Sequence, residues 1–154
     1  MYFVDRHKME DILRYMERLI EEQKKHGYQT FADYLLLERL SHLTVEAMID
    51  VGNQMIDGFI MRDPGSYEDI IDILTDEKVL PDEELEDYKD IIRLRKSVVQ
   101  EYMEVDHDYI LRVWKSKNYS LSQFPNRVRK YLEEELGPVS AFLKAESKDD
   151  NEKL

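Results

Sequence analysis

Apolar residues recur at every third or fourth position along most of this chain, which is the spacing of amphipathic α-helices. In the first such segment, residues 5–26, Asp5 can cap the amino end and Gly27 ends the pattern. This segment therefore predicts a helix with one face turned toward a core.

The second periodic segment, residues 31–60, differs because it carries apolar residues on two sides. A helix with two apolar faces is mostly buried. Glu46, Asp50 and Asn53 form a narrow polar strip along one boundary between those faces. Polar side chains in such a place need hydrogen-bond partners, so the strip predicts a donor from another helix.

Further helices follow a turn at residues 62–65. A short helix is predicted from Ser66, and a longer one from Pro81 to about Met103. The apolar face of the longer helix extends to about residue 115, with a possible bend near residues 105–106.

The last apolar segment contains Pro125, and proline is tolerated only in the first turn of a helix. A separate final helix is therefore expected to start near Ser120 or Ser122. The whole pattern predicts an all-α bundle of about five helices in one domain, residues 1–143. The highly charged residues 144–154 are expected to form a disordered tail.

Composition excludes several classes of protein. The chain has no cysteine, which rules out disulfides, thiolate catalysis and cysteine-bound zinc, and fits a cytoplasmic location. No apolar run approaches the roughly 20 residues that span a bilayer, so no membrane partner is expected.

The net charge of −12 argues against non-specific binding of nucleic acid. Its distribution is uneven, however, because residues 89–130 carry a net charge of +5 and the rest of the chain −17. This asymmetry fits a phosphate-facing surface, and it fits equally well two solvated helix faces of mixed charge.

One basic residue, Arg95, falls on the apolar side of its predicted helix. A buried guanidinium needs a charged or hydrogen-bonding partner, and the polar strip with Glu46 is the candidate. Arg95 is thus either half of a structural ion pair or part of a polar site. Tyr102 lies seven residues, or two helical turns, further along the same side.

Histidines offer no metal site by spacing. His7, His26, His42 and His107 are scattered, and for each an ordinary structural role is the more common reading. His107 is singled out because it lies seven residues beyond Gln100 and would share its face on a straight helix. We expect neither a metal nor another cofactor.

The sequence R-K-S-V-V-Q-E-Y at residues 95–102 resembles the R-x4-H-x-Y motif of the HepT-like toxin family, a branch of the HEPN superfamily. The resemblance continues in VEAMIDVGNQMI at 45–56, in DPGSYEDIIDILTDEKVLPDEE at 63–84 and in EVDHDYI at 104–110. Together these segments cover most of residues 5–132.

The resemblance implies a homodimeric ribonuclease toxin that cuts RNA without metal near its dimer interface. It also implies a partner, a minimal nucleotidyltransferase antitoxin that transfers AMP to the motif tyrosine, here Tyr102. Carried over by position, Arg95 would contact the scissile phosphate. Asp50 and Asn53 would support the site, with Glu46 beside them in the strip.

One departure from the family motif affects the chemistry. Gln100 stands at the position of the motif histidine, and an amide cannot transfer a proton near neutral pH. Gln100 could still orient a phosphate or a 2′-hydroxyl, whereas His107 would need a bend or a dimer partner to take part. Three hypotheses remain: a ribonuclease toxin, a catalytically weakened module that binds RNA, a nucleotide or a nucleotidyltransferase, and a helical dimerisation protein without a ligand.

Overall fold

The computed structural model describes residues 4–138, and the predicted all-α architecture is confirmed over that range. Five α-helices follow one another in the chain: α1 (Arg6–Lys25), α2 (Phe31–Gly58), α3 (Tyr67–Asp76), α4 (Leu85–Arg95) and α5 (His107–Leu136). A short 3₁₀ turn, η1 (Asp82–Glu84), precedes α4, and a π-helical turn, η2 (Lys96–Gln100), follows it. The predicted tail, residues 144–154, lies outside the described residues.

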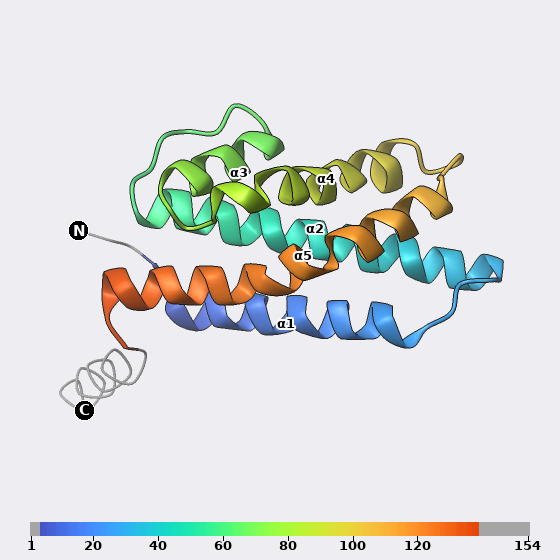
Figure 1. The fold of residues 1–154 in the computed structure, drawn as a ribbon, viewed down its shortest axis with the longest axis horizontal. Helices are drawn as coiled ribbons and strands as arrows, with labels where there is room; N and C mark the ends of the chain where they lie inside the picture. Colours follow the sequence, from blue (N-terminus) through green and yellow to red (C-terminus); the bar gives the residue numbers. More distant parts are fainter. Residues whose placement is uncertain (1–3, 139–154) are drawn as a thin grey trace, which may run out of the picture.

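Helix α2 is the centre of the bundle, since it packs against α1, α3, α4 and α5. In Figure 1 it runs between α3 and α4 on one side and α1 and α5 on the other. Its side chains are buried around most of its circumference, and Met48, Val51 and Met55 are completely enclosed. The two apolar stripes of residues 31–60 therefore bury this helix on both sides, as their pattern predicts.

Three helices begin at capping side chains, two of which, Asp5 and Ser66, were expected from the sequence. Asp5 accepts a hydrogen bond from the amide of Lys8 at the start of α1 (3.0 Å). Thr30 and Asp33 form a reciprocal capping box at the start of α2. Ser66 caps α3. These local interactions explain why the amino ends of α1–α3 could be placed from sequence.

The expectation of a separate last helix is wrong. Helix α5 runs without a break from His107 to Leu136 and carries Pro125 in its interior. Proline kinks a helix because it lacks an N–H and crowds the preceding turn, and α5 changes direction near its middle in Figure 1. Near this bend the carbonyl oxygen of Ser120 lies 2.8 Å from the Tyr88 hydroxyl, which also lies 2.6 Å from Glu84 Oε1. Packing against α4 therefore holds the kinked helix together.

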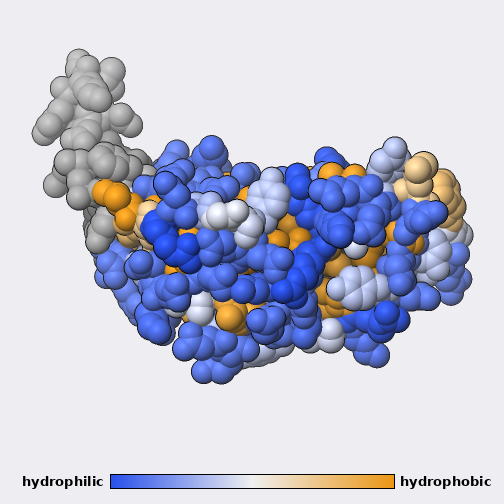
Figure 2. Space-filling model, turned by 90° about the horizontal axis from the view of Figure 1, so that it is seen from above, coloured by the Kyte–Doolittle hydropathy of each residue, from blue (hydrophilic) through white to orange (hydrophobic). Residues whose placement is uncertain are grey.

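Seen from the side of α3 and α4, the surface is mostly hydrophilic, and apolar atoms are visible between the polar ones along its length and at one end (Figure 2). That end holds the start of α2 and the connection between η2 and α5 (Figure 1). Phe31 and Leu35 on α2, and Tyr102 and Met103 in the connection, are its large exposed hydrophobic side chains. No helix within residues 4–138 is both long and apolar enough to cross a membrane.

Gly52 lets α2 and α3 pack closely, because a Cβ built there would overlap Cγ2 of the buried Ile70. We expect Gly52→Ala to lower the free energy of unfolding by about 1–2 kcal/mol, since overpacking outweighs the gain in helix propensity. Urea denaturation would measure this. The penalty should shrink in an Ile70→Ala background, and an equal penalty in both backgrounds would contradict the assigned contact.

Candidate active site

Arg95 is the last residue of α4, and its side chain reaches across to α2. Its Nε donates a hydrogen bond to Oε1 of Glu46 at 2.8 Å. The side chain is half-buried, with 26% of its area exposed, rather than enclosed in the core. The polar strip on α2 thus supplies the partner that it was expected to supply, and the ion pair stays accessible to a ligand.

The guanidinium of Arg95 is fixed on a second side by an aromatic ring. Its Cζ lies 4.8 Å from the ring centroid of Tyr67 at the start of α3, a cation–π distance. The hydrogen bond to Glu46 holds the pKa of Arg95 above its usual range, so the group stays charged. Within residues 4–138 no acceptor binds Nη1 or Nη2 of Arg95. These atoms are free to hold an anion in two-point contact.

The chain changes its helical pitch directly after Arg95. The amide of Glu101 donates to the carbonyl of Lys96 (3.1 Å), the i to i+5 pattern of a π-helical turn. In an α-helix, a residue five positions on would be turned by about 140° around the axis. The wider turn brings Gln100 closer to the side of Arg95, and both line one open groove of about 460 Å³ with Tyr67 and Lys96.

The expected alignment of Arg95 with Tyr102 on one straight helix is wrong. The helical path ends at Glu101, and the amide of Glu104 bonds back to its carbonyl oxygen (3.1 Å) in a turn. Tyr102 is 65% exposed and lies in the connection to α5. An exposed phenol in a turn is accessible to another protein.

Only one member of the polar strip meets Arg95. Asp50 is exposed and Asn53 is half-buried, one and two turns further along α2 than Glu46. Within the described part of the chain, neither has a side-chain hydrogen bond or ion pair. They remain available to a ligand or a second protomer.

His107 does not lie beside Arg95. It begins α5 after a bend in the chain, with its Nε2 3.0 Å from Glu38 Oε2 and its ring stacked on Tyr34 at 4.5 Å. Glu38 precedes Glu46 by eight residues on α2, or about 12 Å along the axis. The bend considered near residues 105–106 therefore occurs, and it carries His107 away from Arg95.

A different histidine, His42, lies next to the ion pair of Arg95 and Glu46. Its Nε2 is 3.5 Å from Oε1 of Glu46, the same oxygen that Arg95 binds. The side chain of His42 is 31% exposed. Sequence reasoning passed over this residue, although its spacing of four from Glu46, the first residue of the polar strip, was a usable signal.

The excess of basic residues between 89 and 130 is largely neutralised. This segment contains ten lysine and arginine residues. Eight of their side chains contact a carboxylate: Lys89, Arg93, Arg95, Lys96, Lys117, Arg127, Arg129 and Lys130. Arg129 is the extreme case, since it binds both Glu10 and Glu17 of α1. Most of the positive segment therefore joins helices instead of forming a phosphate-facing surface.

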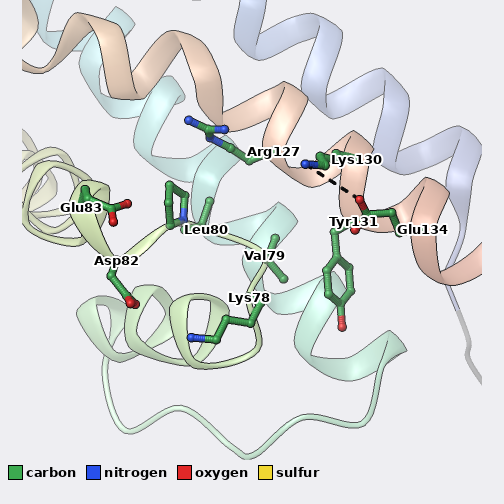
Figure 3. A pocket seen from close by; sticks show the side chains of 10 residues that line it. Lys78, Val79, Leu80, Asp82, Glu83, Arg127, Lys130, Tyr131 and Glu134 are labelled. Carbon is green, nitrogen blue, oxygen red and sulfur yellow. Dashed lines mark ion pairs between the residues drawn. The ribbon is translucent and has the colours of Figure 1, made fainter.

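Another groove, of about 340 Å³, lies between the segment from Lys78 to Glu83 and the end of α5 (Figure 3). Lys130 pairs there with Glu134 (3.9 Å), and Arg127 points its Nη2 at Glu84 (2.7 Å). None of the candidate residues around Arg95 lines this groove. We therefore take the surface around Arg95 as the candidate site.

Comparison with known proteins agrees with this choice of segment. The chain matches the family model "Ribonuclease HepT-like" over residues 9–128, which include both Arg95 and Gln100. It is 49% identical over 143 residues to the Bacillus subtilis (strain 168) protein named "Putative RNase YutE", a match that covers 92% of this chain and 99% of the relative. It is also similar to the solved structure of YutE, described as a cytosolic protein of unknown function, with a TM-score of 0.88 and 48% identity over 92% of this chain and 99% of that one.

The loop before α3, which leads to Tyr67, depends on the ionised state of Asp69. Arg62 and the amide of Gly65 bind this carboxylate and hold its pKa at about 2. The unfolded value is near 4, so its stabilising effect is complete above that pH and is lost as the pH falls toward 2. The difference in unfolding free energy between the native protein and Asp69→Asn should therefore shrink between about pH 4 and pH 2.

Urea unfolding at several pH values would measure this difference. Asp63→Asn is the control, because Asp63 lies in the same loop and contacts no cation within the described residues. An acid-side slope unchanged by Asp69→Asn would contradict the assignment.

Proposed function

This chain belongs to the HepT-like ribonuclease family. We propose that it is itself a ribonuclease, and that the surface around Arg95 is the site where it cleaves RNA without a metal ion. One observation carries the proposal. The Arg95 guanidinium is held by Glu46 and Tyr67 while both of its Nη atoms stay free beside an open groove. A cation fixed before substrate arrives stabilises developing negative charge without the cost of reorganisation.

The reaction that suits this site is internal transfer at a phosphodiester. The 2′-oxygen of the ribose forms a bond to phosphorus, the bond from phosphorus to the 5′-oxygen breaks, and a 2′,3′-cyclic phosphate and a 5′-hydroxyl result. The proton of the 2′-hydroxyl must leave, and the 5′-oxygen must gain one. Arg95 would bind the non-bridging oxygens, on which charge accumulates in the transition state.

Gln100 lines the same groove and would orient the phosphate or the 2′-hydroxyl by hydrogen bonding. It cannot transfer the proton. This substitution also supports the second candidate function, a protein that binds RNA or a nucleotidyltransferase with little or no cleavage.

We infer that the active form is a homodimer. Support comes from the exposed apolar side chains of Phe31, Leu35, Tyr102 and Met103 at one end of the bundle. Exposed apolar patches of this kind mark protein interfaces. Asp50 and Asn53, which have no partner within residues 4–138, would then face the partner protomer or the RNA.

We further propose that the protein acts in the cytoplasm, since its Bacillus subtilis relative is described as cytosolic. Its family resemblance leads us to propose that it is the toxin of a toxin–antitoxin pair. Its antitoxin would be a minimal nucleotidyltransferase that transfers AMP to Tyr102. The exposure of that phenol, 65%, supports access by such an enzyme. AMP on Tyr102 would add a bulky anion two residues from Gln100 and so compete with RNA.

Arg95→Ala should lower the cleavage rate of tRNA or mRNA by about 10²–10³-fold, as for the loss of one donor to a transition-state anion. Purified protein in a buffer containing EDTA would be the reagent. Arg14→Ala is the matched control, because Arg14 is an exposed arginine paired with Glu10 on α1. Gln100→His should raise the rate. Native protein and Gln100→His that both bind RNA without cutting it would favour the binding-module function.

Incubation with ATP and a cognate minimal nucleotidyltransferase should add one AMP to the native protein and none to Tyr102→Phe. Intact-mass spectrometry would detect the adduct. Tyr119→Phe is a suitable control, since Tyr119 is also highly exposed (69%) but lies on α5. Transfer to Tyr102→Phe at the native rate would rule out Tyr102 as the acceptor.

A further inference from the structure

His42 occupies a position that a proton-transfer group would need. The proposed ribonuclease lacks the motif histidine, so some other group must take the 2′-hydroxyl proton. Among the histidines, all of which lie within residues 4–138, His42 is the one that shares a carboxylate oxygen with Arg95. We propose that His42 is the general base of this protein and takes the 2′-hydroxyl proton, while the leaving 5′-oxygen takes its proton from water. This inference rests on the proposed ribonuclease function.

The geometry keeps His42 close to the guanidinium of Arg95. Nε2 of His42 and Nε of Arg95 lie 3.5 and 2.8 Å from the same oxygen, so their separation cannot exceed the sum of these distances. The imidazole therefore lies within about 6 Å of the guanidinium that would hold the phosphodiester. Partial exposure of both side chains (31% and 26%) leaves room for the substrate.

Glu46 gives the imidazole the support that a catalytic histidine requires. A carboxylate next to an imidazole orients the ring and stabilises the imidazolium formed during reaction. Nε2 is the ring nitrogen that faces Glu46 and Arg95, so Nε2 is the atom that would accept the 2′-hydroxyl proton. Glu46 is thus a positioning residue for both Arg95 and His42.

The other candidates are less suited to this step. His107 is paired with Glu38, eight residues before Glu46 on α2, and its ring is stacked on Tyr34. Glu46 itself is occupied by Arg95. The charged groups around His42 are then Glu38 and Glu46 of its own helix, Arg95 of α4 through Glu46, and His107 of α5 through Glu38.

The test compares pH–rate profiles of RNA cleavage between pH 5 and 8 for the native protein and His42→Asn. We expect kcat/KM to fall by about 10²–10⁴-fold and the acidic limb of the profile to disappear. His26→Asn is the matched control. Like His42, His26 pairs with a glutamate four residues away, Glu22 at 2.7 Å, but it lies at the end of α1. That variant should keep both the rate and the profile.

A second variant separates chemistry from folding. Gln100→His restores a proton-transfer group at the motif position, so His42→Asn/Gln100→His should recover cleavage that His42→Asn has lost. Circular dichroism and the thermal midpoint would show that each variant is folded. A rate in the double variant that approaches the rate of Gln100→His alone supports the assignment, since a purely structural defect at position 42 would lower the native and Gln100→His rates by the same factor.

Three outcomes would overturn the assignment in distinguishable ways. If His42→Asn cuts RNA with the native rate and pH profile while Arg95→Ala does not, the ribonuclease stands and His42 is not its base. If His42→Asn is slow but keeps the native profile and is not rescued, His42 is structural. If neither native protein nor Gln100→His cuts RNA, the proposed function fails and takes this inference with it.

Discussion

The burial of α2 is the constraint on which the rest of the structure depends. A helix of 28 residues that packs against four others can keep polar groups only where a neighbour satisfies them or leaves them open to water. That requirement places Glu46 under the end of α4, and it makes Arg95 the charge that meets it. The site is therefore a product of core packing, because the same contact joins two helices and positions the guanidinium.

Helix positions and caps could be predicted because they follow from local physics. The capping residues Asp5, Thr30 and Ser66 act within four residues of themselves. The prediction fails where distant packing overrides local preference. Pro125 should start a helix by its own chemistry, yet Tyr88 and the α4 interface hold α5 together across it. A rule that considers only neighbouring residues cannot predict the hydrogen bond between residues 88 and 120, which are 32 positions apart.

The site was predictable only in part for the same reason. The polar strip on the second helix and the single charged residue in an apolar stripe together predicted a contact between Glu46 and Arg95. This contact joins distant parts of the chain, and only the opposite charges of the two groups could suggest it. The π-helical turn after Arg95 was not visible in the spacing, so the direction of Tyr102 was misjudged. His42 was missed because its importance comes from a third residue, Arg95, which shares its partner.

The pairing of most cations in residues 89–130 with carboxylates has a consequence for the energetics of RNA recognition. Affinity for single-stranded nucleic acid falls with salt by a log–log slope of about −0.7 for each phosphate neutralised, because bound counterions are released. A surface with few unpaired cations neutralises few phosphates and gains little from this release. Recognition would then persist as ionic strength rises, and selectivity would reside in how one phosphodiester fits around Arg95 rather than in attraction to the length of the polymer.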